Sequence, residues 1–303
     1  MAIPRLDHVA TLHGHARPVN AIAFSSDGKR LASGSIDRTI RTWDLDSLQT
    51  VHVMKRHQNA VESIAYSPDG RFLVSGGFDH KLYLWNAITG KVSRTIRHFD
   101  SLVSSVAYSN DGKKIVAGAG DIIRLFDGYW GTVIWTFEGH ESWITSVAFC
   151  ESGALVASGC MDGIIRLWDS GKLQKYDPVL QLDAKGIPVY SVLFSEDRDI
   201  IIGGYDDGTV KIWDMHMATI TREFKAHDLR VRVVAWNARH DLLLTCSDDS
   251  WAKVWDLEAG RCVGGVVQDR MKLHAAAISP DGSIIAIGSE ENDISLWRLK
   301  REG

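Results

Sequence analysis

The chain has 303 residues, of which 45% are hydrophobic and 24% charged, the composition of an ordinary globular protein. Its formal net charge is −4 at pH 7 and its basic residues are scattered, so the charge pattern disfavours nucleic acid and membrane surfaces as partners. No apolar run approaches about 18 residues, no apolar leader opens the chain, and the four cysteines form no CxxC pair. We therefore expect a soluble intracellular protein, cytoplasmic or, in a eukaryote, nuclear.

Short strands are predicted from the start of the chain. A strand-like run at residues 19–24 is followed by the turn Ser26-Asp27-Gly28, and further runs follow at 31–34, 39–43 and 48–53. Asp-Gly turns recur at 69–70, 111–112 and 281–282. No window shows the i, i+3, i+4 spacing of an amphipathic helix. The pattern predicts an all-β protein.

The strand pattern repeats with a period near 42 residues. Aligning each unit on its Trp-Asp end gives successive separations of 42, 41, 42, 45, 42 and 42 residues. The aligned positions are Trp43, Trp85, Phe126, Trp168, Trp213, Trp255 and Trp297. A period of about 40–45 residues, with Gly-His near the start and Trp-Asp near the end, is typical of β-propeller blades. We therefore predict one domain, 1–303, with repeats at approximately 12–53, 54–95, 96–136, 137–181, 182–223, 224–264 and 265–300.

The seventh unit stops before its fourth strand. A four-stranded blade needs neighbours on both faces, so a propeller has to close into a ring. The segment 6–12, ahead of Gly14-His15, is long enough to supply the missing strand. We predict that this N-terminal strand joins the last blade and closes the ring.

The repeat resembles that of the WD40 family over roughly residues 6–300. In the first unit the resemblance is carried by Gly14-His15, Ser33, Asp37 and Trp43-Asp44, with equivalents in later units. It implies a seven-bladed β-propeller of WD40 type. It says little about function, because one fold serves many functions.

Four units contain a His, a Ser or Thr, an Asp and a Trp at constant spacing, with the Asp 22 residues after the His and the Trp 6 after the Asp. The resemblance implies that each set forms a buried hydrogen-bonded chain that runs from aspartate to histidine to hydroxyl to indole. These structural tetrads are His15, Ser33, Asp37 and Trp43; His57, Ser75, Asp79 and Trp85; His140, Ser158, Asp162 and Trp168; and His227, Thr245, Asp249 and Trp255.

The same residue types form the catalytic triads of hydrolases. A nucleophilic triad needs one serine aimed at a cleft, with oxyanion donors beside it. Here the set occurs four times at fixed spacing, which suits a feature used once per blade. We therefore predict a structural role and no catalytic residue.

Three units depart from the tetrad pattern. The substituted residues are Phe99 and Phe126 in the third unit, Lys185 and Gly203 in the fifth, and Asp269 and Glu291 in the seventh. The turn of the third unit is also one residue short. We expect these three blades to lack the network and to be held mainly by packing and backbone pairing.

WD-repeat relatives commonly bind partners on the narrow top face, around the central channel. Three positions per blade usually project there: three and five residues after the histidine, and the residue before the turn aspartate. Transferred to this chain, they form an apolar sector in the first five blades and a charged sector in the others. The partner-binding residues implied by the resemblance are Asn20, Ile36, Glu62, Phe78, Leu102, Ser104, Trp143, Thr145, Met161, Tyr190, Asp206, Arg230, Arg232, Asp248 and His274.

The leading interpretation is a non-catalytic scaffold that docks a protein or peptide on this face, is monomeric by itself and uses no cofactor. The alternative is a propeller enzyme, or a metal- or ligand-binding protein, that uses channel-lining groups such as Glu62 and His274. Two such groups form a poor site, and the pair His13 and His15 lacks a third ligand, so no metal site is predicted. Three or more carboxylate and imidazole groups meeting in the channel would favour the alternative.

Overall fold

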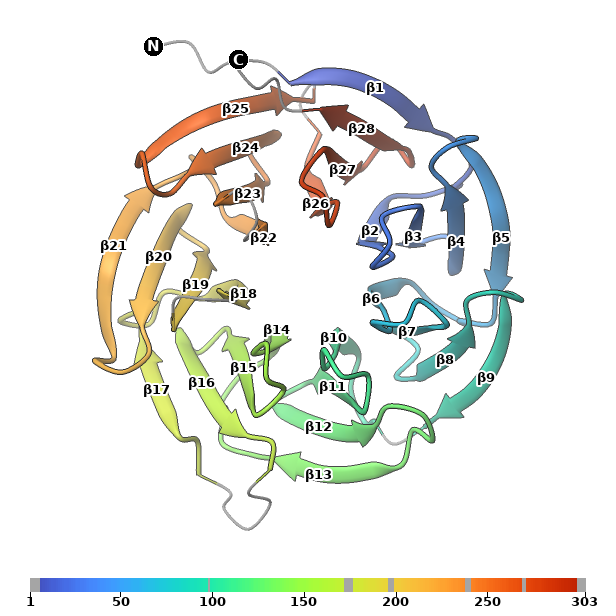
Figure 1. Ribbon diagram of the computed structural model, residues 1–303. Coiled ribbons are helices and arrows are strands. Elements are labelled where there is room, and N and C mark those ends of the chain that lie inside the picture. Colours follow the sequence, from blue (N-terminus) through green and yellow to red (C-terminus); the bar gives the residue numbers. More distant parts are fainter. Residues whose placement is uncertain are drawn as a thin grey trace.

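The computed structural model describes residues 6–97, 99–171, 177–195, 199–237, 241–268 and 271–298. These residues form 28 strands in seven four-stranded sheets, arranged around a central channel (Figure 1). The prediction of an all-β, seven-bladed propeller is confirmed. The described residues contain no helix long and apolar enough to cross a membrane.

In each blade the strands follow one another from the channel outwards (Figure 1). Blade 1 contains β2 (Val19–Phe24), β3 (Arg30–Ser35), β4 (Thr39–Asp44) and β5 (Gln49–Lys55). Blade 2 contains β6 (Val61–Tyr66), β7 (Phe72–Gly77), β8 (Leu82–Asn86) and β9 (Lys91–Ile96). Blade 3 contains β10 (Val103–Tyr108), β11 (Lys114–Ala119), β12 (Ile122–Asp127) and β13 (Val133–Phe137).

The next three blades repeat this order. Blade 4 contains β14 (Ile144–Phe149), β15 (Leu155–Cys160), β16 (Ile164–Asp169) and β17 (Leu180–Asp183). Blade 5 contains β18 (Val189–Phe194), β19 (Ile200–Tyr205), β20 (Thr209–Asp214) and β21 (Thr219–Lys225). Blade 6 contains β22 (Val231–Asn237), β23 (Leu242–Ser247), β24 (Trp251–Asp256) and β25 (Arg261–Val267).

Blade 7 is built from both ends of the chain. Its inner strands are β26 (Leu273–Ile278), β27 (Ile284–Ser289) and β28 (Ile294–Arg298), and its outer strand is β1 (Asp7–Leu12). In this antiparallel pair Thr11 lies opposite Ser295 and Leu12 opposite Ile294. The predicted closure of the ring by the N-terminal strand is confirmed.

The hydrophobic core lies between the blades. Each of the seven clusters among the described residues joins two neighbouring blades; in one of them, Ile40 and Met54 of blade 1 pack against Val61 of blade 2. The approach is close: a Cβ at Gly34 would lie 2.6 Å from Cγ1 of Val61. A glycine is therefore needed at that point of the second strand, because any larger residue would push the two blades apart.

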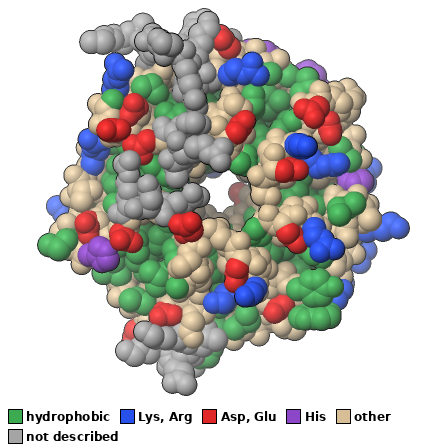
Figure 2. Space-filling view, in the orientation of Figure 1, with side chains coloured by type: hydrophobic (Ala, Val, Ile, Leu, Met, Phe, Trp, Pro, Cys, Tyr) green, Lys and Arg blue, Asp and Glu red, His purple; other side chains and the backbone are tan. Residues whose placement is uncertain are grey.

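The ring has two faces that different loops build. The loops ahead of each innermost strand, and those between the second and third strands, form the top face. The hairpins between the first and second strands, and between the third and fourth, form the bottom face, which points toward the viewer in Figures 1 and 2. Figure 2 shows an open channel at the centre of this bottom face, with apolar and acidic side chains around it.

Candidate functional site

Each of the four tetrads lies together inside one blade. In blade 1, Nδ1 of His15 is 2.8 Å from Oδ2 of Asp37, its Nε2 is 2.7 Å from Oγ of Ser33, and Nε1 of Trp43 donates to that Oγ at 2.9 Å. The corresponding distances in the sets built around His57, His140 and His227 lie between 2.6 and 3.0 Å. Each chain of bonds links a top-face loop to the third strand of its blade.

Within a tetrad, burial and hydrogen bonds keep the aspartate ionised and the histidine neutral. Burial alone raises the pKa of the Asp37 carboxyl, but hydrogen bonds from His15, Thr39 and the Ala16 amide outweigh burial and hold the pKa well below its usual value. Burial lowers the pKa of His227, so this ring is neutral at pH 7 and its Nδ1–H donates to the Asp249 carboxylate.

The tetrad hydroxyls have no access to substrate. The side chains of Ser33, Ser75, Ser158 and Thr245 belong to residues that are completely buried. A nucleophile has to reach a cleft with oxyanion donors beside it. The arrangement is therefore that of a structural network and differs from that of a hydrolase triad.

Blade 5 corrects the expectation that the divergent blades lack a network. Nε1 of Trp213 donates to the hydroxyl of Tyr205 at 2.9 Å, so the phenol takes the place of the missing serine hydroxyl. A Cβ at Gly203 would lie 2.9 Å from the Tyr205 ring. Gly203, at the serine position, therefore leaves room for Tyr205, whose hydroxyl takes the role of the missing serine.

Blades 3 and 7 hold the aromatic residue at the tryptophan position in two different ways. In blade 7, Nε1 of Trp297 donates to Oγ of Ser295 at 2.8 Å. This is a second departure from the expectation that the divergent blades are held by packing alone. Asp269, at the histidine position, lies outside the described residues. In blade 3, the rings of Phe99 and Phe126 pack with centroids 5.8 Å apart, as expected of an apolar replacement.

A β-bulge marks the same top-face position in every blade. The pairing of the first two strands slips at one residue each time, and that residue has no register partner. The seven bulge residues are Asn20, Glu62, Ser104, Thr145, Tyr190, Arg232 and His274. A bulge turns its side chain out of the pleat, which explains why this position of the innermost strand supplies the channel mouth.

The charged sector is a network of ion pairs across blades 5 and 6. Nε of Arg230 lies 3.3 Å from Asp206 and 3.2 Å from Asp248, and its Nη1 donates to the Tyr190 hydroxyl at 2.8 Å. Arg232 donates to the same Asp248 through Nε and, at 3.3 Å, through Nη2. Two arginines share one carboxylate, so their positions are set before any partner arrives.

The two channel-lining groups considered for chemistry have separate partners. Glu62 accepts from Nδ2 of Asn20 at 2.8 Å, and its burial raises its pKa, opposed by that hydrogen bond and by the charge of Arg232. Nε2 of His274 is 3.6 Å from Glu290; burial and Arg232 lower the pKa of this histidine. Each group is therefore held within the wall of the channel by its own neighbour.

Two of the predicted contact residues have their hydroxyls occupied. Oγ of Ser104 donates to the Ile144 carbonyl at 2.6 Å, and Oγ1 of Thr145 donates to the Val189 carbonyl at 2.6 Å. Both acceptors belong to the next blade, so these hydroxyls fasten neighbouring blades together at the channel mouth.

The apolar sector is open to solvent in part. Phe78 is 42% exposed, Trp143 55% and Met161 38%, whereas Ile36 and Leu102 are half-buried. Phe78 and Met161 follow the second strands of blades 2 and 4, and Trp143 precedes the innermost strand of blade 4. These loops therefore present large apolar side chains that are partly open to solvent.

Among the described residues, one group of three carries ligand atoms within 4.8 Å of one another: His140, Cys160 and Asp162. Two of the three, His140 and Asp162, belong to the tetrad of blade 4. Nη1 of Arg166 donates to Oδ2 of Asp162 at 2.6 Å, so the protein's own guanidinium already occupies the cation position. The arrangement fits a structural ion pair better than a metal centre.

Sequence reasoning missed the aromatic loop of blade 3. Tyr129 and Trp130 are 56% and 58% exposed on the bottom face. The signal was an aromatic pair within the five-residue connection between β12 and β13, where polar turn residues are usual.

The comparison with known families agrees with this geometry. Six segments match the family model described as WD domain, G-beta repeat: residues 6–44, 48–86, 90–127, 131–169, 177–214 and 218–256. They cover more than half of the chain, which therefore belongs to the WD40 family. Each match begins at the outer strand of one blade and ends at the third strand of the next. Repeat and blade are thus one strand out of phase, which is why β1 completes blade 7.

Individual relatives match over short segments. The chain is 57% identical over 37 residues to vegetative incompatibility protein HET-E-1 of Podospora anserina, covering 12% of this chain and 3% of that protein. It is 60% identical over 35 residues to the Notchless protein homolog of Arabidopsis thaliana, covering 12% and 7%. Pre-mRNA-processing factor 19 homolog 2 of the same plant is 30% identical over 66 residues, covering 22% and 12%. The chain thus spans a small part of each relative.

Proposed function

We propose that this protein is a non-catalytic interaction scaffold that docks a peptide or protein surface on its top face. The observation that carries the proposal is the exposure of Phe78 and Trp143 on loops that the tetrads fix to the sheets. Large exposed apolar side chains on a rigid frame are the usual anchors of protein interfaces. Membership of a family that typically mediates protein interactions supports the same function.

The charged sector adds orientation to this surface. Arg230 and Arg232 are held by Asp206 and Asp248, so little side-chain entropy is lost when a partner contacts them. Charged groups at the rim of an interface act mainly on the association rate and on the choice of partner. The apolar sector would supply most of the affinity and the charged sector the orientation.

The test compares three immobilised forms of the protein in lysate from its own source. These are the unmodified protein, the top-face variant Phe78→Ala with Trp143→Ala, and a control variant, Val179→Ala with Met217→Ala, which removes exposed apolar side chains elsewhere. Thermal melting first establishes that all three are equally folded. Bound proteins are then quantified by mass spectrometry, and interacting candidates are re-measured as purified pairs.

The proposal expects partners that are retained by the control variant and lost from the top-face variant. Loss of one hot-spot aromatic typically weakens binding by about 2 kcal/mol or more, which is roughly thirtyfold. Equal retention by both variants would place binding elsewhere on the ring and overturn the top-face assignment.

A further inference from the structure

A pocket on the bottom face lies between blades 2 and 3 and has a volume of about 410 Å³. Phe72 and Tyr129 form an aromatic wall, with ring centroids 5.8 Å apart and the rings perpendicular. The carboxylates of Asp69 and Asp111 stand in the two hairpins that border it, and Tyr108 lines it from the end of the inner strand β10. No lysine or arginine is among the lining residues.

The hydroxyl of Tyr108 is the unusual group in this pocket. Tyr108 is only 9% exposed, and its Oη is buried without a hydrogen-bond partner among the residues that the structure describes. Burial, and then the negative charge of Asp69, raise the pKa of this phenol, so its oxygen stays protonated. A buried hydroxyl without a partner costs free energy, which a ligand that hydrogen-bonds to it would recover.

The two carboxylates are ionised and held in place. Oδ1 of Asp69 accepts from Oγ of Ser67 at 2.6 Å and from the Arg71 amide at 3.0 Å, while Oδ1 of Asp111 accepts from Oγ of Ser109 at 2.7 Å. These bonds leave the second oxygen of each group for other donors. The charge of Arg71 acts on Asp69, and Nζ of the exposed Lys113 is 3.7 Å from Oδ2 of Asp111.

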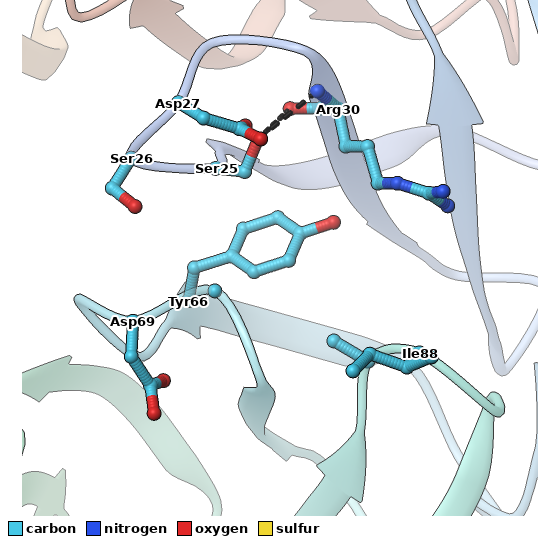
Figure 3. A pocket seen from close by; sticks show the side chains of 9 residues that line it. Ser25, Ser26, Asp27, Arg30, Tyr66, Asp69 and Ile88 are labelled. Carbon is cyan, nitrogen blue, oxygen red and sulfur yellow. Dashed lines mark hydrogen bonds between the residues drawn. The ribbon is translucent and has the colours of Figure 1, made fainter.

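The neighbouring pocket between blades 1 and 2 shows what fills this type of site. It has the same construction, with Tyr66 in place of Tyr108, but its volume is about 190 Å³. Figure 3 shows the Tyr66 ring between the hairpin that ends at Arg30 and the loop of Ile88, with the Arg30 side chain extended on the side of the tyrosine hydroxyl. The charge of Arg30 opposes the rise in the pKa of Tyr66 that burial causes.

The boundary between blades 3 and 4 repeats this use of a cation. There Lys114 stands at the position of Arg30, and its Nζ donates to Oγ of Ser170 in the next blade at 2.9 Å. In the pocket between blades 2 and 3 the equivalent residue is Phe72. The phenol oxygens of Tyr66 and Tyr108 are both buried without a partner among the described residues, so the difference lies in the cation: the chain supplies its own on either side and leaves the middle pocket with carboxylates and an aromatic wall.

We propose that this pocket binds an arginine side chain of a partner polypeptide. The guanidinium packs against the wall formed by Tyr129 and Phe72, donates to Asp69 and Asp111, and donates to Oη of Tyr108. A planar cation with five donors suits this set, because carboxylates accept from it at fixed angles and aromatic faces attract it. The exposed Tyr129 and Trp130, at 56% and 58%, supply apolar contact for the chain that carries the arginine.

The test is an NMR titration of the full chain with N-acetyl-arginine N-methylamide, following the backbone amides around the pocket. The citrulline analogue has the same shape without the charge, and the lysine analogue has the charge without the planar fork. Phe72→Arg copies the neighbouring blade and fills the pocket internally, while Phe72→Leu keeps an apolar wall without a cation. Tyr108→Phe removes one hydroxyl that bonds to nothing, so the fold is kept.

The proposal expects saturable shifts at the pocket with the arginine probe, none with citrulline, and weaker binding of lysine. Phe72→Arg should abolish the shifts, whereas Phe72→Leu, which loses one aromatic ring but adds no cation, should keep saturable shifts with weaker binding. Tyr108→Phe should weaken binding by about three- to tenfold, the effect of one lost hydrogen bond. Absence of saturable shifts, equal response to citrulline or lysine, or unchanged binding in both Phe72→Arg and Tyr108→Phe would overturn it. If Phe72→Arg does not fold, the Tyr108→Phe result decides.

Discussion

Tyr205 shows how one blade keeps its network after losing two of its members. Its hydroxyl accepts from Trp213 inside the blade, and the missing side chain at Gly203 gives the ring its space. By contrast, the hydroxyl of Tyr108 is also buried but bonds to nothing within the described residues. Two tyrosines of the same fold therefore differ in one hydrogen bond.

We predict that Tyr205→Phe lowers the free energy of unfolding by about 1–3 kcal/mol, because the indole N–H of Trp213 then has no acceptor. Tyr108→Phe is the matched control, which removes a hydroxyl without breaking a bond, and should leave stability unchanged or slightly higher. Urea unfolding followed by tryptophan fluorescence measures both. Equal effects of the two substitutions would contradict this account.

The tetrads also predict how stability depends on pH. Burial lowers the pKa of His140 and His227 in the folded protein, whereas in the unfolded chain both titrate near 6.5. Below that pH the unfolded state takes up more protons, so stability falls as the solution is acidified. The aspartates have folded-state pKa values below 3.8, so their contribution is complete above that pH and is lost only on further acidification.

We therefore expect the melting temperature to fall from about pH 7.5 to pH 5, with up to about 1.4 kcal/mol lost per pH unit for each histidine that titrates only in the unfolded state. A His227→Gln variant is less stable at every pH but should show a shallower slope, since one of the titrating groups is gone. Thermal melts across this range give the slopes. A flat profile in the unmodified protein would refute the prediction.

At the scale of elements, β1 is the strand on which ring closure depends. Leu12 is almost completely buried among Trp43, Ile294 and Leu296, while Val9 in the same strand faces solvent. Without β1 the third strand of blade 7, β28, would become an exposed edge with its apolar face uncovered. Closure is therefore a matter of buried area as well as of backbone hydrogen bonds.

Leu12→Ala should cost about 2–5 kcal/mol of unfolding free energy, because it opens a cavity at the junction of blades 7 and 1. Val9→Ala, in the same strand, should change stability by less than about 0.5 kcal/mol. Deleting residues 1–12 should lower the melting temperature more than either substitution. Differential scanning calorimetry compares the four proteins, and an unchanged melt after the deletion would exclude a closing role for β1.

At the scale of the whole molecule, each blade is stabilised mainly by its contacts with the neighbouring blades. Every cluster of buried apolar residues crosses a boundary between blades. Serine hydroxyls add to this on the innermost strands: Oγ of Ser63 accepts from the Val106 amide at 3.0 Å, and Ser105 accepts from Val147 at 3.0 Å. Stability in such a ring is shared between neighbours, as in other repeat proteins.

A fragment of three blades, residues 6–137, should therefore fail to fold by itself, since its two ends expose half of an apolar cluster each. The fragment 138–298 should behave in the same way, and mixing the two should restore the β-sheet circular dichroism and a cooperative melt. The intact chain is expected to melt in one transition. Independent cooperative melting of either fragment would show that the blades are self-sufficient.

Much of the fold follows from local patterns. The Trp-Asp spacing fixed the number of blades, and the 22-residue interval from His15 to Asp37 identified the tetrad, because each of these features is repeated at constant distance along the chain. The substitute network of Tyr205 was not predicted. Its hydroxyl enters from two residues beyond the serine position, and spacing alone does not show which way a side chain turns.

The candidate binding surfaces were likewise predictable only in part. The resemblance to WD-repeat relatives predicted the position occupied by Arg232, and the bulge that aims its side chain became visible only in the strand register. Its shared use of Asp248 with Arg230, and the pocket of Tyr108 between two blades, depend on side chains that different loops bring together.

The sequence by itself determined the all-β class, the seven blades and the closing strand, because strand periodicity and turn residues act over a few neighbouring positions. The tetrads followed from a constant spacing together with the resemblance to WD40 repeats. Only the tertiary structure decided what the surfaces offer. Residues about 42 positions apart meet across a blade boundary, and whether they leave an ion pair, a filled pocket or an open one depends on the packing of both blades at once.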